Sequence, residues 1–261
     1  MTGQPHNAEL RVAPFVRSGS RVGRTQHTDR REGYDPTLPH ESWTVRQFDA
    51  QLLQLNAAFY VQLCADRETQ GRGVAMRGVC IGSSNDVMPI IAALPWCETV
   101  ATWDPAQGAS FEPFAWTDNS MTATMWSMLA GEFDAYSDLT TWRKSLTSVE
   151  SMSGSLAELP ERSCDVVSLT LDGRAGAEET LAIFKKSLDI IDRGGAFFAV
   201  IRNAERIGNF GVASTWLTSI RLSEQLASWG VRQARMRQLS AISRFETGRG
   251  EKTFVVSGRF A

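Results

Sequence analysis

The sequence predicts an α/β fold: a mostly parallel sheet with helices on both faces, closed by an antiparallel hairpin at its C-terminal end. Short apolar runs typical of buried strands alternate with segments of helical periodicity between residues 78 and 201. The first run ends in a turn of small residues and the second in an acid. The chain closes with two long alternating segments joined by a glycine-containing turn, which indicates a hairpin.

The composition excludes several classes of protein. A chain of 261 residues with 43% hydrophobic content predicts one domain with an appended arm or cap. The net charge of −2 argues against a nucleic-acid or membrane partner. No apolar run approaches the roughly 20 residues of a membrane span, and the N-terminus lacks the apolar region of a signal peptide. The four cysteines lack C-x-x-C spacing, which favours a reducing, cytoplasmic setting.

Residues 1–33 are polar, rich in arginine and without apolar periodicity, so we expect a flexible arm. An organelle transit peptide is the alternative, but Glu9, Asp29 and Glu32 argue against it. No aromatic residues alternate with the basic ones, which favours a solvated tail over a nucleic-acid clamp. No His/Cys/Asp cluster has the spacing of metal ligands, so we predict no metal site.

Residues 34–70 predict a helical lid. A turn-rich entry begins at Tyr34, and Ser42 is placed to cap a helix that runs to about Arg67. Its apolar positions repeat at helical spacing: Val45, Phe48, Leu52, Leu55, Phe59 and Leu63. Residues 71–261 then form the main domain.

The stretch 78–86 organises that domain. A strand at 79–81 is followed by Gly82, two serines and a helical pattern, and the second strand, 99–103, ends in Asp104. Small residues let a ligand approach the backbone at a helix N-terminus. An acid about 20 residues further on is placed to accept hydrogen bonds from ribose hydroxyls. These residues predict a nucleotide-binding turn and leave the cofactor open.

The segment after Asp104 predicts a helix over 121–136 and a short helix over 142–149 that leads into an edge strand. The Met/Trp stripe at helical spacing is either core or a ligand wall, and the pattern favours core: Met121, Met125, Trp126 and Met128.

The second half continues the alternation. We expect strands at 164–171 and 196–201, helices at 177–191 and 212–229, and hairpin strands at 235–245 and 252–259. Asp172 ends the first of these strands, where it either acts on substrate or caps the following helix.

From about Tyr34 to Phe260 the chain resembles class I S-adenosylmethionine-dependent methyltransferases, in particular the nicotinamide, phenylethanolamine and indolethylamine N-methyltransferase family. Four stretches carry the likeness: I-G-S-S at 81–84, T-W-D at 102–104, V-V-S-L-T-L-D at 166–172 and R-G-G-A-F at 193–197. The resemblance implies a Rossmann-like sheet of seven strands and S-adenosyl-L-methionine as cofactor.

The resemblance also implies roles for single residues. Gly82 and Ser83 would line the methionine and ribose, Asp104 would hold the ribose hydroxyls, and Glu150 and Ser151 would meet the adenine edge. Ser84 and Pro105 would also belong to the cofactor site. Ser168 and Thr170 would lie beside the sulfonium, and Tyr34 would fold over the cofactor. The acceptor side would comprise Trp43, Arg202 and Asn203, with Asp172 as the catalytic candidate.

The chain departs from the family pattern at informative positions. Cys80 replaces the acid that opens the first motif, Ser84 replaces a glycine, and Pro105 replaces an aromatic residue. Where the amine-methylating relatives have an acid after the fifth strand, this chain has Arg202 and Asn203. A guanidinium suits a carboxylate or another anionic acceptor.

The sequence therefore predicts an enzyme that methylates N or O of a small molecule, anionic by the Arg202 argument. Two alternatives stay open: a methyltransferase-like protein that binds without catalysis, supported by Cys80 and Ser84, and a nicotinamide-dependent oxidoreductase. The missing G-x-G-x-x-G glycines and the terminal hairpin argue against the second alternative. The sequence specifies no oligomeric state.

Overall fold

The computed structural model describes residues 47–82, 86–104, 116–117, 119–152, 154, 158, 160–172, 177–202, 219–241 and 251–260. All of them belong to one unit, Gly33–Ala261.

A seven-stranded sheet forms the centre of this unit, in the order β3-β2-β1-β4-β5-β7-β6. The pairs from β3 to β5 are parallel, and β7 runs antiparallel to both β5 and β6. The strands are β1 Met76–Ile81, β2 Cys97–Trp103, β3 Glu150–Met152, β4 Cys164–Asp172, β5 Ile191–Arg202, β6 Val231–Ala241 and β7 Glu251–Phe260. The order and the closing hairpin confirm the predicted Rossmann-like sheet of seven strands with an antiparallel C-terminal hairpin.

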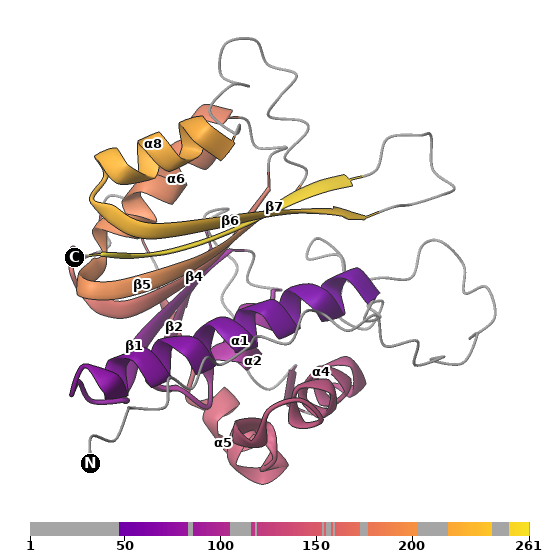
Figure 1. Ribbon diagram of the computed structural model, residues 1–261. Helices are drawn as coiled ribbons and strands as arrows, with labels where there is room; N and C mark the ends of the chain where they lie inside the picture. Colours follow the sequence, from indigo (N-terminus) through magenta and orange to yellow (C-terminus); the bar gives the residue numbers. More distant parts are fainter. Residues whose placement is uncertain are drawn as a thin grey trace, which may run out of the picture. The chain divides into compact units, whose positions relative to one another are not determined.

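Helices cover both faces of the sheet (Figure 1). One face carries α1 and α2, with α4 and α5 beyond them, and the other carries α6 and α8. The helices are α1 Gln47–Thr69, α2 Met88–Ala93, α4 Ser120–Ala130, α5 Leu139–Thr147, α6 Ala177–Asp189 and α8 Ser219–Ser228, with a 3-10 turn η2 at Asp134–Tyr136.

Strand alternation divides the interior into two cores. Cys80 and Val166 point toward α1, α2, α4 and α5, whereas Val79, Ile81 and Val167 point toward α6 and α8. Both faces of β1 and β4 are therefore buried, as their continuous apolar runs predict.

Three of the four members of the Met/Trp stripe of α4, namely Met121, Met125 and Trp126, belong to the first core, which confirms the core interpretation for them, whereas Met128 is half-buried outside it. Met125 is fully buried, and Trp126 stacks on Trp142 of α5 with ring centroids 4.9 Å apart. Tyr136 closes the cluster, because its hydroxyl donates to the Ala92 carbonyl at 2.6 Å.

Several strands begin earlier than the sequence predicts, including β1 at Met76, not Val79, and β2 at Cys97, not Thr99. The largest shifts are those of β5 and β6, each of which contains an irregularity near its start. β5 starts at Ile191, not Ala196, and Gly194 is left-handed (φ +75°) where the β4–β5 register shifts. β6 starts at Val231, not Arg235, and Gln233 (φ +55°) lies in the corresponding shift between β6 and β7. Such bulges interrupt the alternation that sequence patterns detect.

Asp165 links three elements at the amino-terminal edge of the parallel strands. Its Oδ2 accepts the Arg77 backbone N–H of β1 at 2.9 Å and the Arg77 Nε–H at 3.2 Å. Its Oδ1 accepts from Arg67 of α1 at 3.4 Å. Burial alone would raise the pKa of Asp165, but the hydrogen bonds and the two guanidinium charges outweigh it and lower that pKa below its usual value.

We expect Asp165→Asn to lower the free energy of unfolding by about 1–2 kcal/mol at pH 7, because charge-assisted bonds are weakened. A lowered folded-state pKa means that the carboxylate stabilises the fold above its unfolded-state pKa of about 3.9 and loses this effect as pH falls through the folded value. Urea unfolding at pH 7 and pH 3 should therefore show a penalty that shrinks in acid. Asp134→Asn, at an exposed position, is the control; a penalty independent of pH contradicts the account.

Candidate functional site

The candidate site lies where the parallel strands end. β1 sits between β2 and β4, so the crossovers leave it in opposite directions and its carboxyl end is a topological switch point. Gly82 follows β1, Asp104 follows β2, and Asp172 and Arg202 end β4 and β5. The topology therefore places these four sequence-predicted residues along one edge of the sheet.

Gly82 packs against β4 with no room for a side chain. Its N–H donates to the Trp103 carbonyl at 3.1 Å. A Cβ at this position would stand 3.1 Å from the Thr170 carbonyl oxygen and 3.3 Å from Thr170 Cβ. The glycine thus lets the end of β1 lie close to β4, and it keeps the start of the following turn as bare backbone.

Asp86 supplies a carboxylate beside this turn that the sequence analysis missed. It is 3% exposed, and its Oδ1 accepts the Met88 N–H at 3.2 Å at the start of α2. Burial and then the Asp86 charge raise the pKa of the Cys80 thiol far above its usual value. Asp86 therefore brings a buried carboxylate to the neighbourhood of Cys80. The sequence contains a signal for this residue: the Asp-x-x-Pro pattern at 86–89 is typical of the start of a helix, where an aspartate accepts backbone N–H groups.

Asp104 is half-buried directly after β2. Glu150 and Ser151 are exposed on the edge strand β3, level with Ala101 and Thr102. Because Glu150 pairs with Ala101, it lies beside a residue that precedes Asp104 by three positions along the chain.

Glu158 is a second acid near this edge that the sequence analysis did not identify. The Trp103 Nε1–H donates to the Gly154 carbonyl at 3.3 Å, which ties the loop after β3 to the end of β2. A Cβ on Gly154 would collide with the Glu158 carboxylate. Glu158 therefore stands beside the end of β2, whereas Glu150 stands at the start of β3.

Polar residues from three strands share the face that α1 covers. Asp172 and Arg202 are direct partners in the β4–β5 register; Asp172 is half-buried and Arg202 is 5% exposed. Phe254 pairs with Ile201, so the fully buried Thr253 lies level with Arg202. Strand alternation puts Ser168 and Thr170 on this same face. Thr253 joins the set only through the sheet register, which the sequence does not reveal.

Ser168 is sealed beneath α1. It is fully buried, and its hydroxyl lies 3.0 Å from the Tyr60 hydroxyl and 3.5 Å from Asn56 Oδ1. Burial raises the pKa of the Tyr60 phenol well above its usual value, so the two hydroxyls share a hydrogen bond in which either can be the donor. In this arrangement Ser168 contacts the helix rather than an open site.

The remaining sequence-predicted residues lie outside the described part of the chain: Tyr34, Trp43, Ser83, Ser84, Pro105 and Asn203. Among the described residues, no group of three or more His, Cys, Asp or Glu side chains is placed to hold a metal ion. None of the described helices combines the length and apolarity needed to cross a bilayer.

Two cavities lined by described residues lie away from this edge. One, of about 570 Å³, opens between the C-terminal half of α1 and Trp96. The other, of about 670 Å³, lies at the amino-terminal edge of β4 and β5.

No family model and no curated protein matches the chain. Among solved structures it is similar to a putative methyltransferase from Bacillus halodurans (10% identity, TM-score 0.43, covering 78% of this chain and 97% of that one). It is also similar to the N-methyltransferase NodS from Bradyrhizobium japonicum (9%, 0.44, 79% and 95%) and to a 16S rRNA (adenine(1408)-N(1))-methyltransferase from Catenulisporales acidiphilia (15%, 0.40, 78% and 91%).

We expect Gly82→Ala to lower the free energy of unfolding by about 1–2 kcal/mol, because the new methyl group pushes against the Thr170 backbone. Gly73→Ala is the matched control: nothing lies within 4 Å of a Cβ there, so this substitution should be neutral or slightly stabilising. Urea unfolding of both variants checks the difference, and equal stabilities would contradict the close approach of β1 and β4.

Proposed function

We propose that this protein is an S-adenosylmethionine-dependent methyltransferase that acts on N or O of a small molecule bearing an anionic group. The observation that carries the proposal is the turn after β1: Gly82 held against Thr170, with the carboxylates of Asp86 and Asp104 near the adjoining strand ends.

The residues at this turn fit the cofactor. Bare backbone at Gly82 admits a ligand, Asp104 accepts hydrogen bonds from ribose hydroxyls, and Asp86 offers a carboxylate to the methionine amino group. Either Glu158 or Glu150 receives the adenine edge. When bound, S-adenosylmethionine supplies an electrophilic methyl group.

The acceptor side rests on Arg202 and Asp172. A guanidinium that is 5% exposed at a strand end binds a carboxylate through two parallel hydrogen bonds. Asp172, its partner in the register, orients the acceptor and takes its proton. Thr253 adds a buried hydroxyl beside them. α1, with Tyr34 and Trp43 before it, excludes water, so that positioning provides most of the rate enhancement.

One observation favours the alternative of a protein that binds without turnover. Ser168, which the resemblance puts beside the sulfonium, is fully buried against Tyr60 and Asn56. Cofactor binding without product across a broad acceptor panel would support this alternative.

Calorimetry with S-adenosylhomocysteine tests the cofactor site. We expect the wild type to bind, Asp104→Ala to bind about tenfold or more weakly because two charge-assisted bonds are lost, and Asp86→Asn to show a smaller loss. Asp134→Ala, at an exposed carboxylate outside the site, should bind as the wild type does. Absence of wild-type binding at millimolar ligand would rule out the proposal.

Release of S-adenosylhomocysteine from matched pairs of aromatic acids and their amides tests the acceptor. We expect the wild type to favour the acids, and Arg202→Gln to lose that preference through a KM raised about tenfold or more. Arg202→Lys keeps the charge but not the paired bonds, so it should be intermediate. Equal rates on acids and amides would contradict an anionic acceptor, and the stability of each variant is checked by urea unfolding.

A further inference from the structure

A cavity lined by described residues lies at the opposite edge of the sheet from Gly82 and Asp104. It measures about 670 Å³, within the range of small-molecule sites. Four chain segments surround it: the turn before β4 with Arg162, residues 188–193 between α6 and β5, residues 227–232 between α8 and β6, and Phe260 at the end of β7. None of these residues belongs to the proposed methyl-transfer site.

The acids of this cavity are already neutralised from outside it. Asp189 pairs with Lys185, Glu161 lies 3.9 Å from Lys186, and Asp192 lies 3.9 Å from Arg77. These three cations do not line the cavity.

The arginines of the cavity have no such partners. Arg162, Arg193 and Arg232 are exposed, and within the described part of the chain their guanidinium groups make no hydrogen bond or ion pair. The lining has three acids and three arginines, and because the acids are paired from outside, the arginines are its unpaired charges and attract an anion.

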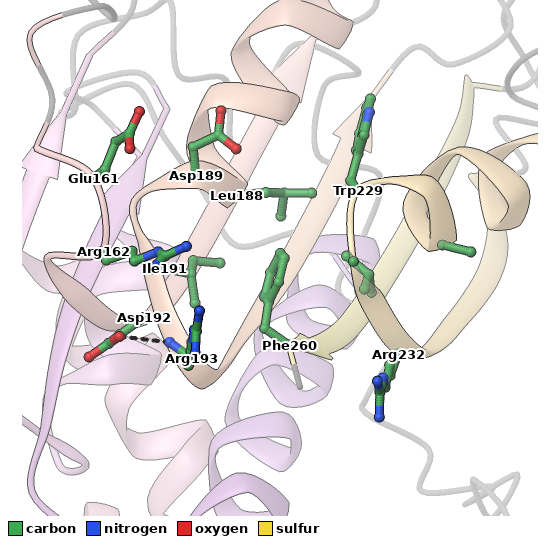
Figure 2. A pocket seen from close by; sticks show the side chains of 13 residues that line it. Glu161, Arg162, Leu188, Asp189, Ile191, Asp192, Arg193, Trp229, Arg232 and Phe260 are labelled. Carbon is green, nitrogen blue, oxygen red and sulfur yellow. Dashed lines mark hydrogen bonds between the residues drawn. The ribbon is translucent and has the colours of Figure 1, made fainter.

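The positive groups face an apolar wall. Figure 2 shows the guanidinium groups of Arg162 and Arg193 directed toward the Ile191 side chain, with the Phe260 ring beyond it, whereas Arg232 points away from Phe260. Trp229 is half-buried against Phe184, with ring centroids 6.1 Å apart. A flat ring packs on such aromatic side chains, while two guanidinium groups hold an anionic substituent.

The backbone holds Arg162 in an unusual conformation. Its φ of +51° is left-handed, which L side chains rarely adopt. The strand-like pairing around it keeps it there: the Arg162 N–H donates to the Asp189 carbonyl at 3.1 Å, and the Ser163 N–H donates to the Ile190 carbonyl at 2.8 Å. Strained residues of this kind cluster at functional sites.

We propose that this cavity binds a small aromatic anion, a flat ring carrying a phosphate or carboxylate as in a nucleoside monophosphate, with Arg162 and Arg193 holding the anion. The site is separate from the methyl-transfer site and does not depend on the proposed function.

Calorimetric titration with guanosine 5′-monophosphate and with indole-3-acetate tests the proposal and separates phosphate from carboxylate. We expect at least one of the two to bind at submillimolar concentration. Guanosine has the ring without the anion and ribose 5-phosphate has the anion without the ring, so each should bind about tenfold more weakly than guanosine 5′-monophosphate. Arg162→Gln and Arg193→Gln should each weaken binding about tenfold.

Two variants serve as controls. Arg143→Gln, at an exposed position of α5, and Asp104→Ala, in the proposed cofactor site, should leave this binding unchanged. If Arg162→Gln fails to fold, Arg193→Gln decides the question. The proposal is overturned if neither aromatic anion binds at millimolar concentration, or if binding is the same in Arg193→Gln as in the wild type.

Discussion

The pairing of β1 with β4 is the constraint on which the rest of the structure depends. The two strands are neighbours in the sheet, although β2, β3 and several helices intervene along the chain. Their register, Gly78 with Val166 through Ile81 with Leu169, brings Gly82 against Thr170. It also fixes the switch point, because β2 continues the sheet on one side of β1 and β5 continues it beyond β4. As a result, the residues at the carboxyl ends of β1, β2, β4 and β5 lie along one edge of the sheet.

Among the described residues, the two edges of the sheet differ in the charged groups that they carry. At the carboxyl edge the carboxylates of Asp86, Asp104 and Asp172 predominate around strand ends, with Arg202 as a buried cation. At the amino edge, Asp165 is held between guanidinium groups, and the neighbouring cavity has arginines in excess of unpaired acids. A site for a sulfonium cofactor with ribose hydroxyls suits the first edge, and an anion site suits the second.

The strand order, the hairpin and the turn at Gly82 follow from patterns that local sequence carries, because burial on both faces and small turn residues leave a direct signature. Asp104 could be predicted for the same reason. The contact of Tyr60 with Ser168, 108 residues apart, could not, since helix packing across a sheet leaves no local signal. Thr253 beside Arg202 depends on the register between β5 and β7, and the pairing of strands so far apart in the chain leaves no local signal.

The central claim, that the carboxyl edge at Gly82 binds S-adenosylmethionine, is tested most directly by hydrogen–deuterium exchange with and without S-adenosylhomocysteine. The account predicts added protection in peptides that span the ends of β1 and β2, around Gly82 and Asp104, and unchanged exchange in the peptide that contains Trp229 and Arg232. Unchanged exchange at both strand ends under saturating ligand would contradict it.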